Sequence, residues 1–245
     1  QEISQMVDVI KTFYTKLELF DENKYWVRLS VRNPETPDKY LGEDSIWNHS
    51  EEILKKICDK ENLNYKVGEG EAAFYGPKLD FMFKDAIGRE WQLATVQLDF
   101  NMPNRFELEY TDKDGTKKTP VMIHRAIAGS LERFMSVVIE HFAGNFPFWM
   151  SPVQVSVITI NEKHNDYGLE VSNALKSEGF RVDFDNGDDG FGKKVRAVKT
   201  SKIPYFVIIG DAEMESKTLT LESRDGGKIG TIDLQSLIEK LKIEN

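Results

Sequence analysis

Residues 145–152 read Asn-Phe-Pro-Phe-Trp-Met-Ser-Pro, two prolines around bulky apolar side chains, and the pattern of the chain changes at this point. Before this segment, short β-prone runs are separated by tight turns; after it, apolar strands alternate with helical patterns. Such a change is typical of a junction between domains. Because 245 residues are enough for two domains, we expect one domain over residues 1–148 and a second over residues 149–245.

The first domain is predicted to combine helices with an antiparallel sheet. Apolar residues recur at helical spacing over 3–17, 44–61 and 125–142, while polar and apolar residues alternate over 24–32. Between residues 64 and 110, β-prone runs are split by turn residues such as Gly76-Pro77. Strands joined by short turns pair antiparallel, because parallel neighbours need long crossovers. An α+β fold is therefore expected.

The second domain is predicted to be a small α/β unit. Strands are expected over 153–160, 180–184, 205–209 and near 219–221, and helices over 166–178, 193–202 and 233–243. This alternation predicts a parallel or mixed sheet covered by helices.

Composition narrows the class of protein. The single cysteine, Cys58, excludes an intramolecular disulfide framework and a metal site built from several cysteines. A net charge of -9 argues against a protein that coats nucleic acid non-specifically, although it does not exclude a local basic patch. No apolar run approaches the roughly 18 residues of a membrane span and no signal peptide is visible, so a cytoplasmic location is expected. A start at Gln1 instead of Met favours a processed or truncated piece.

The predicted helix over 125–142 carries an unusual pattern. Its apolar stripe predicts the face that packs on the core, and the stripe consists of Leu131, Phe134, Met135, Val138 and Phe142. Away from it, small residues surround Arg133, where a solvated face would carry mostly Lys and Glu. Small residues let a ligand or another backbone approach, and a guanidinium offers a fixed fork to phosphate. A surface arginine beside a packing glycine explains the pattern equally well.

Three further features precede this helix, and each has a structural alternative. His124 is a candidate metal ligand, although a single histidine at a strand-to-helix junction is more often structural. Gly76-Pro77 forces a turn that would present Tyr75 and Lys78 to a cleft, or simply closes a hairpin. In the strand over 91–100, strict alternation places Thr95, Gln97 and Asp99 on one face and Gln92 on the other, so this polar face meets either a ligand or solvent.

Five basic residues without an acid follow in the second domain, at positions 193, 194, 196, 199 and 202. On a helix they would lie close enough to meet a phosphate backbone. The acidic residues over 183–189 weaken that interpretation, and a solvated helix face is an equal alternative.

Several motifs, taken together, resemble the threonyl-tRNA synthetases. They are Gly70-Glu-Ala-Ala-Phe-Tyr-Gly-Pro-Lys-Leu-Asp80, Thr95-Val-Gln-Leu-Asp-Phe100, Val121-Met-Ile-His-Arg-Ala126 continued by Gly129-Ser-Leu-Glu-Arg-Phe134, and Phe146-Pro-Phe-Trp-Met-Ser-Pro-Val-Gln154. Their order and spacing match, and the resemblance covers essentially the whole chain. It implies part of a class II synthetase catalytic core, an antiparallel sheet flanked by helices, followed by a small α/β anticodon-binding domain.

The resemblance implies an enzyme that activates threonine with ATP, used with Mg²⁺, and transfers it to the 3′ end of its tRNA. His124 matches a ligand of a catalytic zinc that takes the amino and hydroxyl groups of threonine. Arg133 matches the arginine that holds the ATP phosphates. The other matches are Lys78 as a catalytic pocket cation, Gln92 and Thr95 as ATP contacts, Tyr75 and Gln97 as threonine contacts, and Glu215 and Arg224 as anticodon contacts.

Several departures from the family pattern accompany the resemblance. The other zinc ligands, the motif 2 arginine, the motif 1 dimerisation helix and the editing domain have no match here, and Cys58 does not match the zinc-binding cysteine. The segment Asp185–Gly190 lacks a basic residue common in the family, which puts its anticodon contacts in doubt.

We therefore expect the C-terminal portion of a threonine–tRNA ligase, homodimeric when intact and inactive as this piece alone. A non-catalytic tRNA-binding or regulatory remnant of a synthetase is the alternative. A class II synthetase for another amino acid is a third interpretation, against which His124 and Gln97 argue.

Overall fold

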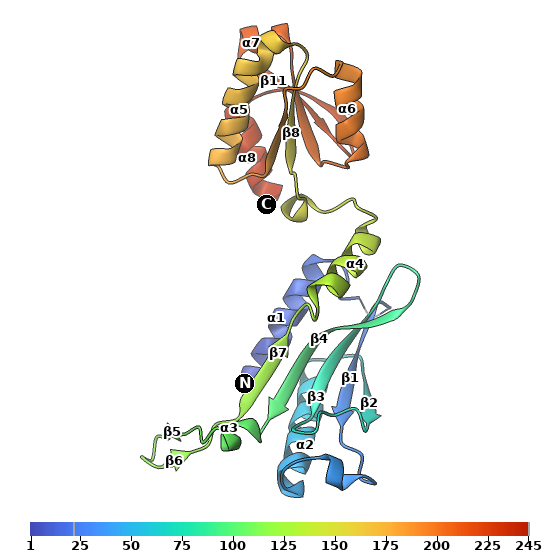
Figure 1. The fold of residues 1–245 in the computed structure, drawn as a ribbon, viewed down its shortest axis with the longest axis vertical. Coiled ribbons are helices and arrows are strands. Elements are labelled where there is room, and N and C mark those ends of the chain that lie inside the picture. Colours follow the sequence, from blue (N-terminus) through green and yellow to red (C-terminus); the bar gives the residue numbers. More distant parts are fainter. Residues whose placement is uncertain (22, 245) are drawn as a thin grey trace. The chain divides into compact units, whose positions relative to one another are not determined.

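The computed structural model describes residues 1–21 and 23–244. The chain forms two compact units, Gln1–His141 and Phe142–Asn245, each with its own sheet (Figure 1). The sequence places the division between residues 148 and 149, and the two units divide between His141 and Phe142.

The first unit is built on a five-stranded sheet. In spatial order its strands are β2 (Tyr65–Glu69), β1 (Tyr25–Val31), β3 (Lys78–Lys84), β4 (Glu90–Asp99) and β7 (Met122–Ala126). The helices are α1 (Glu2–Lys16), η1 (Pro37–Lys39), α2 (Asp44–Lys60), α3 (Met102–Arg105) and α4 (Leu131–Phe142). A separate small hairpin pairs β5 (Tyr110–Thr111) with β6 (Lys117–Lys118).

The predicted antiparallel pairing holds for most of this sheet. Strands β1 and β3, β3 and β4, and β4 and β7 pair antiparallel. The expectation is wrong for β2, which pairs with β1 in parallel. Helix α2 lies between these two strands in sequence and returns the chain to the end at which β1 began, so β2 must run in the same direction as β1.

Cross-strand register gives the first sheet one apolar and one polar face. Leu79, Phe81 and Phe83 of β3 point to the apolar face, where the ring of Tyr14 from α1 stacks on Phe83 at 4.0 Å. Helices α1 and α2 are joined there by Lys11, whose Nζ donates to the carbonyl of Glu61 at 2.9 Å. The opposite face of the sheet carries the polar side chains.

Helix α4 begins later than the sequence predicts. Arg125 and Ala126 belong to β7, and the turn after them contains Gly129 at φ +59°. The predicted core stripe is also wrong in part, since the side chains of Leu131 and Met135 are 64% and 50% exposed. Residues 134, 137, 138 and 141 face inward instead, the i, i+3, i+4, i+7 spacing of a helix that starts at residue 131.

The second unit contains the mixed sheet that the sequence predicts. In spatial order its strands are β12 (Gly227–Asp233), β11 (Thr218–Ser223), β10 (Tyr205–Ile209), β8 (Val155–Thr159) and β9 (Val182–Asp185). β8 is parallel to both β9 and β10, whereas β11 is antiparallel to β10 and β12. Its helices are η2 (Phe148–Met150), η3 (Glu162–His164), α5 (Asn165–Ser177), α6 (Phe191–Thr200), α7 (Asp211–Ser216) and α8 (Leu234–Glu244).

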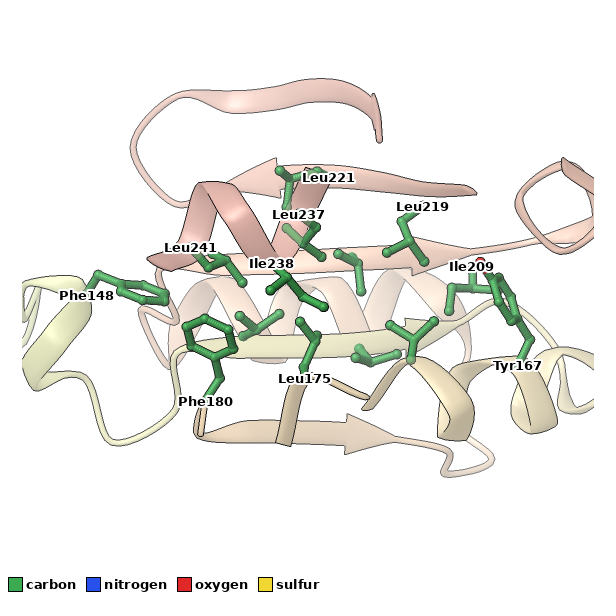
Figure 2. Packing of buried hydrophobic residues seen from close by; sticks show 14 residues of the cluster. Phe148, Tyr167, Leu175, Phe180, Ile209, Leu219, Leu221, Leu237, Ile238 and Leu241 are labelled. Carbon is green, nitrogen blue, oxygen red and sulfur yellow. The ribbon is translucent and has the colours of Figure 1, made fainter. Parts of the chain in front are cut away.

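Helices cover both faces of this second sheet. Leu175 from α5 and Leu237 and Leu241 from α8 pack with Leu219 and Leu221 of β11 in one apolar cluster (Figure 2). A smaller cluster on the other face joins Val198 of α6 with strand and loop residues. Among the described residues, no helix is both long and apolar enough to cross a membrane.

Candidate active site

A strip of polar side chains crosses the first sheet because residues paired across strands share a face. The register pairs Arg28 with Asp80, Asp80 with Thr95, Lys78 with Gln97, and Gln97 with His124. Four strands therefore contribute side chains to one surface, and most of the predicted site residues come together there.

A β-bulge brings Gln92 to the same surface. The register of β3 and β4 shifts between Phe81 and Met82, so that Leu93 has no partner of its own. The extra residue reverses the alternation, and Gln92 Nε2 lies 2.9 Å from Thr95 Oγ1. Strict alternation, which predicted Gln92 on the face opposite Thr95, is wrong at this point.

One half of the polar strip surrounds Asp80, which is fully buried. Its Oδ1 accepts from Gln92 Nε2 at 2.7 Å and from Thr95 Oγ1 at 3.1 Å. Its Oδ2 accepts from Ser30 Oγ at 2.8 Å, from Arg28 Nη2 at 3.2 Å and from Lys78 Nζ. We call these six residues the Asp80 cluster.

The other half of the strip joins His124 to Asp99. His124 Nε2 lies 2.9 Å from Asp99 Oδ2; the histidine side chain is 42% exposed and the carboxylate is buried. Burial alone would raise the pKa of Asp99. The hydrogen bonds from His124 and from the backbone N–H groups of Met102 and Asn101 outweigh that effect, so this pKa lies below its ordinary value. Because a carboxylate only accepts, Nε2 is the donor of this hydrogen bond.

Tyr75 lies between His124 and Gln97. Its hydroxyl donates to Gln97 Oε1 at 3.0 Å, and its ring centroid lies 5.7 Å from that of His124. Burial and the negative charge of Asp99 raise the pKa of Tyr75, so the hydroxyl stays protonated and able to donate. A hollow of about 410 Å³ lies beside Gln97 and His124, and its lining residues are Thr95, Gln97, Ile123, His124, Arg125 and Ala126.

Arg133 reaches the bulge in β4 from the first turn of α4. Its Nη1 donates to the carbonyl of Gln92 at 3.3 Å, and its guanidinium carbon lies 5.7 Å from the centroid of the Trp91 ring. Gly129 lets α4 begin this close, since a Cβ there would lie 3.0 Å from the carbonyl oxygen of Leu93. The small residue at 129 therefore makes room for the backbone of β4 and not for a ligand.

The described residues supply one candidate zinc ligand and not a complete zinc site. His124 has the carboxylate partner that metal-binding histidines commonly have. Yet no group of three or more His, Cys, Asp or Glu side chains in the described part of the chain is placed to hold a metal ion. Cys58 is buried in α2, where burial raises its pKa to about 12.

In the second unit, the structure does not bring together the two predicted anticodon contacts. Glu215 is exposed in α7, just before β11, and Arg224 follows the end of that strand. A strand of six residues spans roughly 20 Å. Arg224 donates from Nη1 to the carbonyls of Phe146 and Lys202, at 3.2 and 3.1 Å.

The basic stretch over 193–202 is largely engaged within the unit. Lys193 pairs with Asp189 at 2.7 Å, Lys199 lies 3.5 Å from a carboxylate oxygen of Glu222, and Lys194 is buried. Lys194 Nζ donates to the carbonyl of Asp185 at 3.1 Å. Lys193, Arg196 and Lys199 nevertheless remain exposed on α6, with a carboxylate beside two of them. Residues 186–190 of the segment Asp185–Gly190 border a hollow of about 280 Å³ beside Asn161, Glu162 and Asn165.

Two groups of the polar strip had no predicted role, namely the buried carboxylate of Asp80 and the Arg28–Ser30 pair. A signal for both was present in the sequence. Polar residues alternate with apolar ones in both β1 and β3, which predicts a polar face on neighbouring strands. What the sequence lacked was the register that places these positions opposite one another.

Comparison with known proteins follows the division into two units. A family model described as the tRNA synthetase class II core domain (G, H, P, S and T) matches residues 1–142. The chain belongs to this family. A second model, described as an anticodon binding domain, matches residues 154–244.

Two relatives of this class II core are both named threonine–tRNA ligase. A threonine–tRNA ligase of Thermotoga sp. (strain RQ2) is 46% identical over 244 residues, which are 100% of this chain and 37% of the relative. A threonine–tRNA ligase of Thermosynechococcus vestitus is 45% identical over 98% of this chain and 39% of its own length. The chain thus spans well under half the length of these curated relatives.

Solved structures also resemble this class II core together with its second unit. The RNA binding domain of threonyl-tRNA synthetase from Cryptosporidium parvum Iowa II matches with a TM-score of 0.89 and 36% identity, covering 100% of this chain and 60% of that one. A putative threonyl-tRNA synthetase from Aeropyrum pernix matches with a TM-score of 0.72 and 28% identity, covering 98% of this chain and 60% of that one.

Proposed function

We propose that this chain is the C-terminal part of a threonine–tRNA ligase, which activates threonine with ATP and transfers it to the 3′ end of threonine tRNA. The observation that carries the proposal is the polar strip, in which the Asp80 cluster lies beside the Tyr75–Gln97 and His124–Asp99 pairs on one sheet face. The names of the relatives support threonine as the amino acid that is activated. The short coverage of those relatives supports a longer working polypeptide.

Tyr75, Gln97 and His124 would form the threonine end of the site. Since Tyr75 donates its hydroxyl proton to Gln97 Oε1, the amide nitrogen of Gln97 would serve as the donor to threonine and the phenol oxygen of Tyr75 as an acceptor. Gln97 lines the hollow. A polar pocket of this kind favours a hydroxyl amino acid over an isostere that lacks the hydroxyl, because buried polar groups would then lose their partner.

Gln92, Thr95, Lys78 and Arg133 would form the ATP end. When the threonine carboxylate attacks the α-phosphate, the bond to pyrophosphate breaks and negative charge accumulates on the leaving group. The cations of Arg133 and Lys78 would stabilise that charge without a proton transfer. The site would take ATP with Mg²⁺, whose own charge adds to the same effect.

We also propose His124 as one ligand of a zinc ion, with the remaining ligands outside this chain. Zinc would supply a Lewis acid for the amino and hydroxyl groups of threonine. Because the described residues do not complete a zinc site, no step of the reaction is assigned to the metal. Metal analysis of the longer polypeptide, with and without His124→Ala, tests this assignment.

The second unit would bind the anticodon of threonine tRNA, with Glu215 and Arg224 as contacts about one strand length apart. The spacing suits separate positions on the RNA more than one shared base. We further propose that the longer enzyme is a homodimer and that it is located in the cytoplasm.

The test is threonine-dependent ATP–pyrophosphate exchange, followed by aminoacylation of threonine tRNA, with the polypeptide as its gene encodes it. Threonine should support exchange and valine should not, and Arg133→Ala should lower the rate by about a hundredfold or more. Residues 1–245 alone should be inactive. RNA binding without exchange by the longer polypeptide would instead favour the non-catalytic alternative.

A further inference from the structure

The carboxylate of Asp80 is the most heavily engaged buried group on the polar face, and no ligand can touch it. Its side chain is 0% exposed, whereas that of Lys78 is 15% exposed and reaches the surface. Gln92 and Thr95 are also partly exposed. Any influence of Asp80 on a bound molecule must therefore pass through the side chains that it holds.

The two oxygens of Asp80 hold different groups. Among the described residues, Oδ1 accepts from Gln92 and Thr95, and Oδ2 accepts from Lys78, Ser30 and Arg28. A lysine side chain carries much rotational freedom, so pairing with a fixed carboxylate limits where its ammonium group points. A single buried group thus sets the positions of an amide, a hydroxyl and an ammonium.

The surroundings of Asp80 balance its charge. Arg28 contacts both Asp80 Oδ2, at 3.2 Å, and Glu71 Oε2, at 3.1 Å, so two cations face two carboxylates. A balanced network holds its members in place and leaves Lys78 without a large excess of negative charge around it.

The threonine end of the proposed site is held by a separate network. Tyr75 bonds to Gln97, and His124 bonds to Asp99, which is in turn held by backbone N–H groups. No hydrogen bond between the described residues joins Asp80 to Tyr75, His124 or Asp99. The polar strip is therefore divided into two parts, and a buried aspartate holds a side chain of each: Asp80 in one, and Asp99, which holds His124, in the other.

We propose that Asp80 is a positioning residue for ATP, which orients Lys78, Gln92 and Thr95 without touching the nucleotide, and that it has little effect on threonine binding. This assignment rests on the proposed function, since it concerns the ATP end of the same site. It predicts an effect confined to one substrate, which a general loss of stability would not produce.

The experiment compares Asp80→Asn with Ser50→Ala in the full-length polypeptide, by threonine-dependent exchange. Asparagine keeps the shape but cannot accept at both ends, so one set of donors loses its partner. We expect the KM for ATP to rise or kcat to fall by about tenfold or more, with the KM for threonine within about threefold of the unsubstituted protein. Ser50→Ala removes a buried hydroxyl of α2 that donates to the carbonyl of Ile46 and lies outside the polar strip, so both KM values should stay within about threefold.

A double-substitution cycle tests the route through Lys78 and also covers the case in which Asp80→Asn does not fold. Lys78→Gln with Asp80→Asn is a neutral pair that leaves no unpaired charge. In the Lys78→Gln background, Asp80→Asn should have an effect smaller by about threefold or more than in the unsubstituted protein. An equal effect in both backgrounds would overturn the assignment.

The remaining outcomes separate this assignment from the proposed function. If the unsubstituted protein shows exchange and Asp80→Asn leaves the kinetics for ATP unchanged, or shifts the KM values for both substrates alike, the positioning role is wrong and the proposed function stands. If the unsubstituted protein shows no threonine-dependent exchange, the proposed function and the positioning role both fail.

Discussion

Cys58 shows how one residue's surroundings decide its chemistry. Its side chain is fully buried in α2 among apolar neighbours of the first unit. Burial, together with the negative charge of Asp59, raises the pKa of its thiol to about 12. Since the thiolate is the reactive form and the form that binds metals, the folded chain keeps this cysteine inert.

The thiol of Cys58 should therefore resist labelling at pH 8 until the protein unfolds. Because the folded pKa is the higher one, the folded state holds a proton that the unfolded state loses between about pH 9 and pH 12. The contribution of this group to stability is present below pH 9 and is lost as the pH rises toward 12. Denaturant titrations should show a shallower decline over this range for Cys58→Ala than for the unsubstituted chain. Fast, stoichiometric labelling of the native protein would contradict the prediction.

At the scale of elements, β4 and its neighbours control the site. The bulge at Leu93 turns Gln92 toward Thr95, and the exposed carbonyl of Gln92 accepts from Arg133. Close packing beside the same strand depends on Gly76, since a Cβ there would lie 1.8 Å from the carbonyl oxygen of Leu98. That clash involves backbone, which cannot move aside as a flexible side chain can.

Gly76→Ala should destabilise the first unit by about 1–3 kcal/mol, because the strand or the turn must shift to relieve the contact. Urea unfolding measures the change. The matched control is Gly192→Ala in α6, where a Cβ meets open space and the backbone has no positive φ. That control should be neutral or stabilising by up to about 1 kcal/mol, since alanine favours helix. Equal stability of the two variants would show that the contact at Gly76 is relieved without cost.

The sequence predicted elements better than the contacts between them. Periodicity identified α2 and the alternation of strand and helix in the second unit, because it records which side chains face a core. It missed β12 and α7, which are short or weakly patterned. It placed Gln92 on the wrong face and began α4 too early, since an extra residue in a strand and a glycine turn leave little trace in apolar spacing. Gln97 and His124 came together through cross-strand register, which no single segment encodes, and the turn before β3 brought Tyr75 to Gln97.

For the whole molecule, the division into two units matters most. Each unit has its own sheet, and the two family models match on either side of residues 143–153. The core of the second unit is formed by its own strands together with α5 and α8 (Figure 2). A unit that buries its apolar side chains against its own elements satisfies the main requirement for independent folding.

Residues 142–245 should therefore fold when produced alone and unfold in one cooperative transition, followed by far-ultraviolet circular dichroism in urea. Leu237 is fully buried in the core cluster, so Leu237→Ala should lower the free energy of unfolding by about 2–5 kcal/mol. Leu169 lies on α5 with its side chain 49% exposed, and Leu169→Ala should change it by no more than about 0.5 kcal/mol. A gradual, non-cooperative transition, or equal effects of the two substitutions, would mean that the second unit needs the rest of the chain to organise its core.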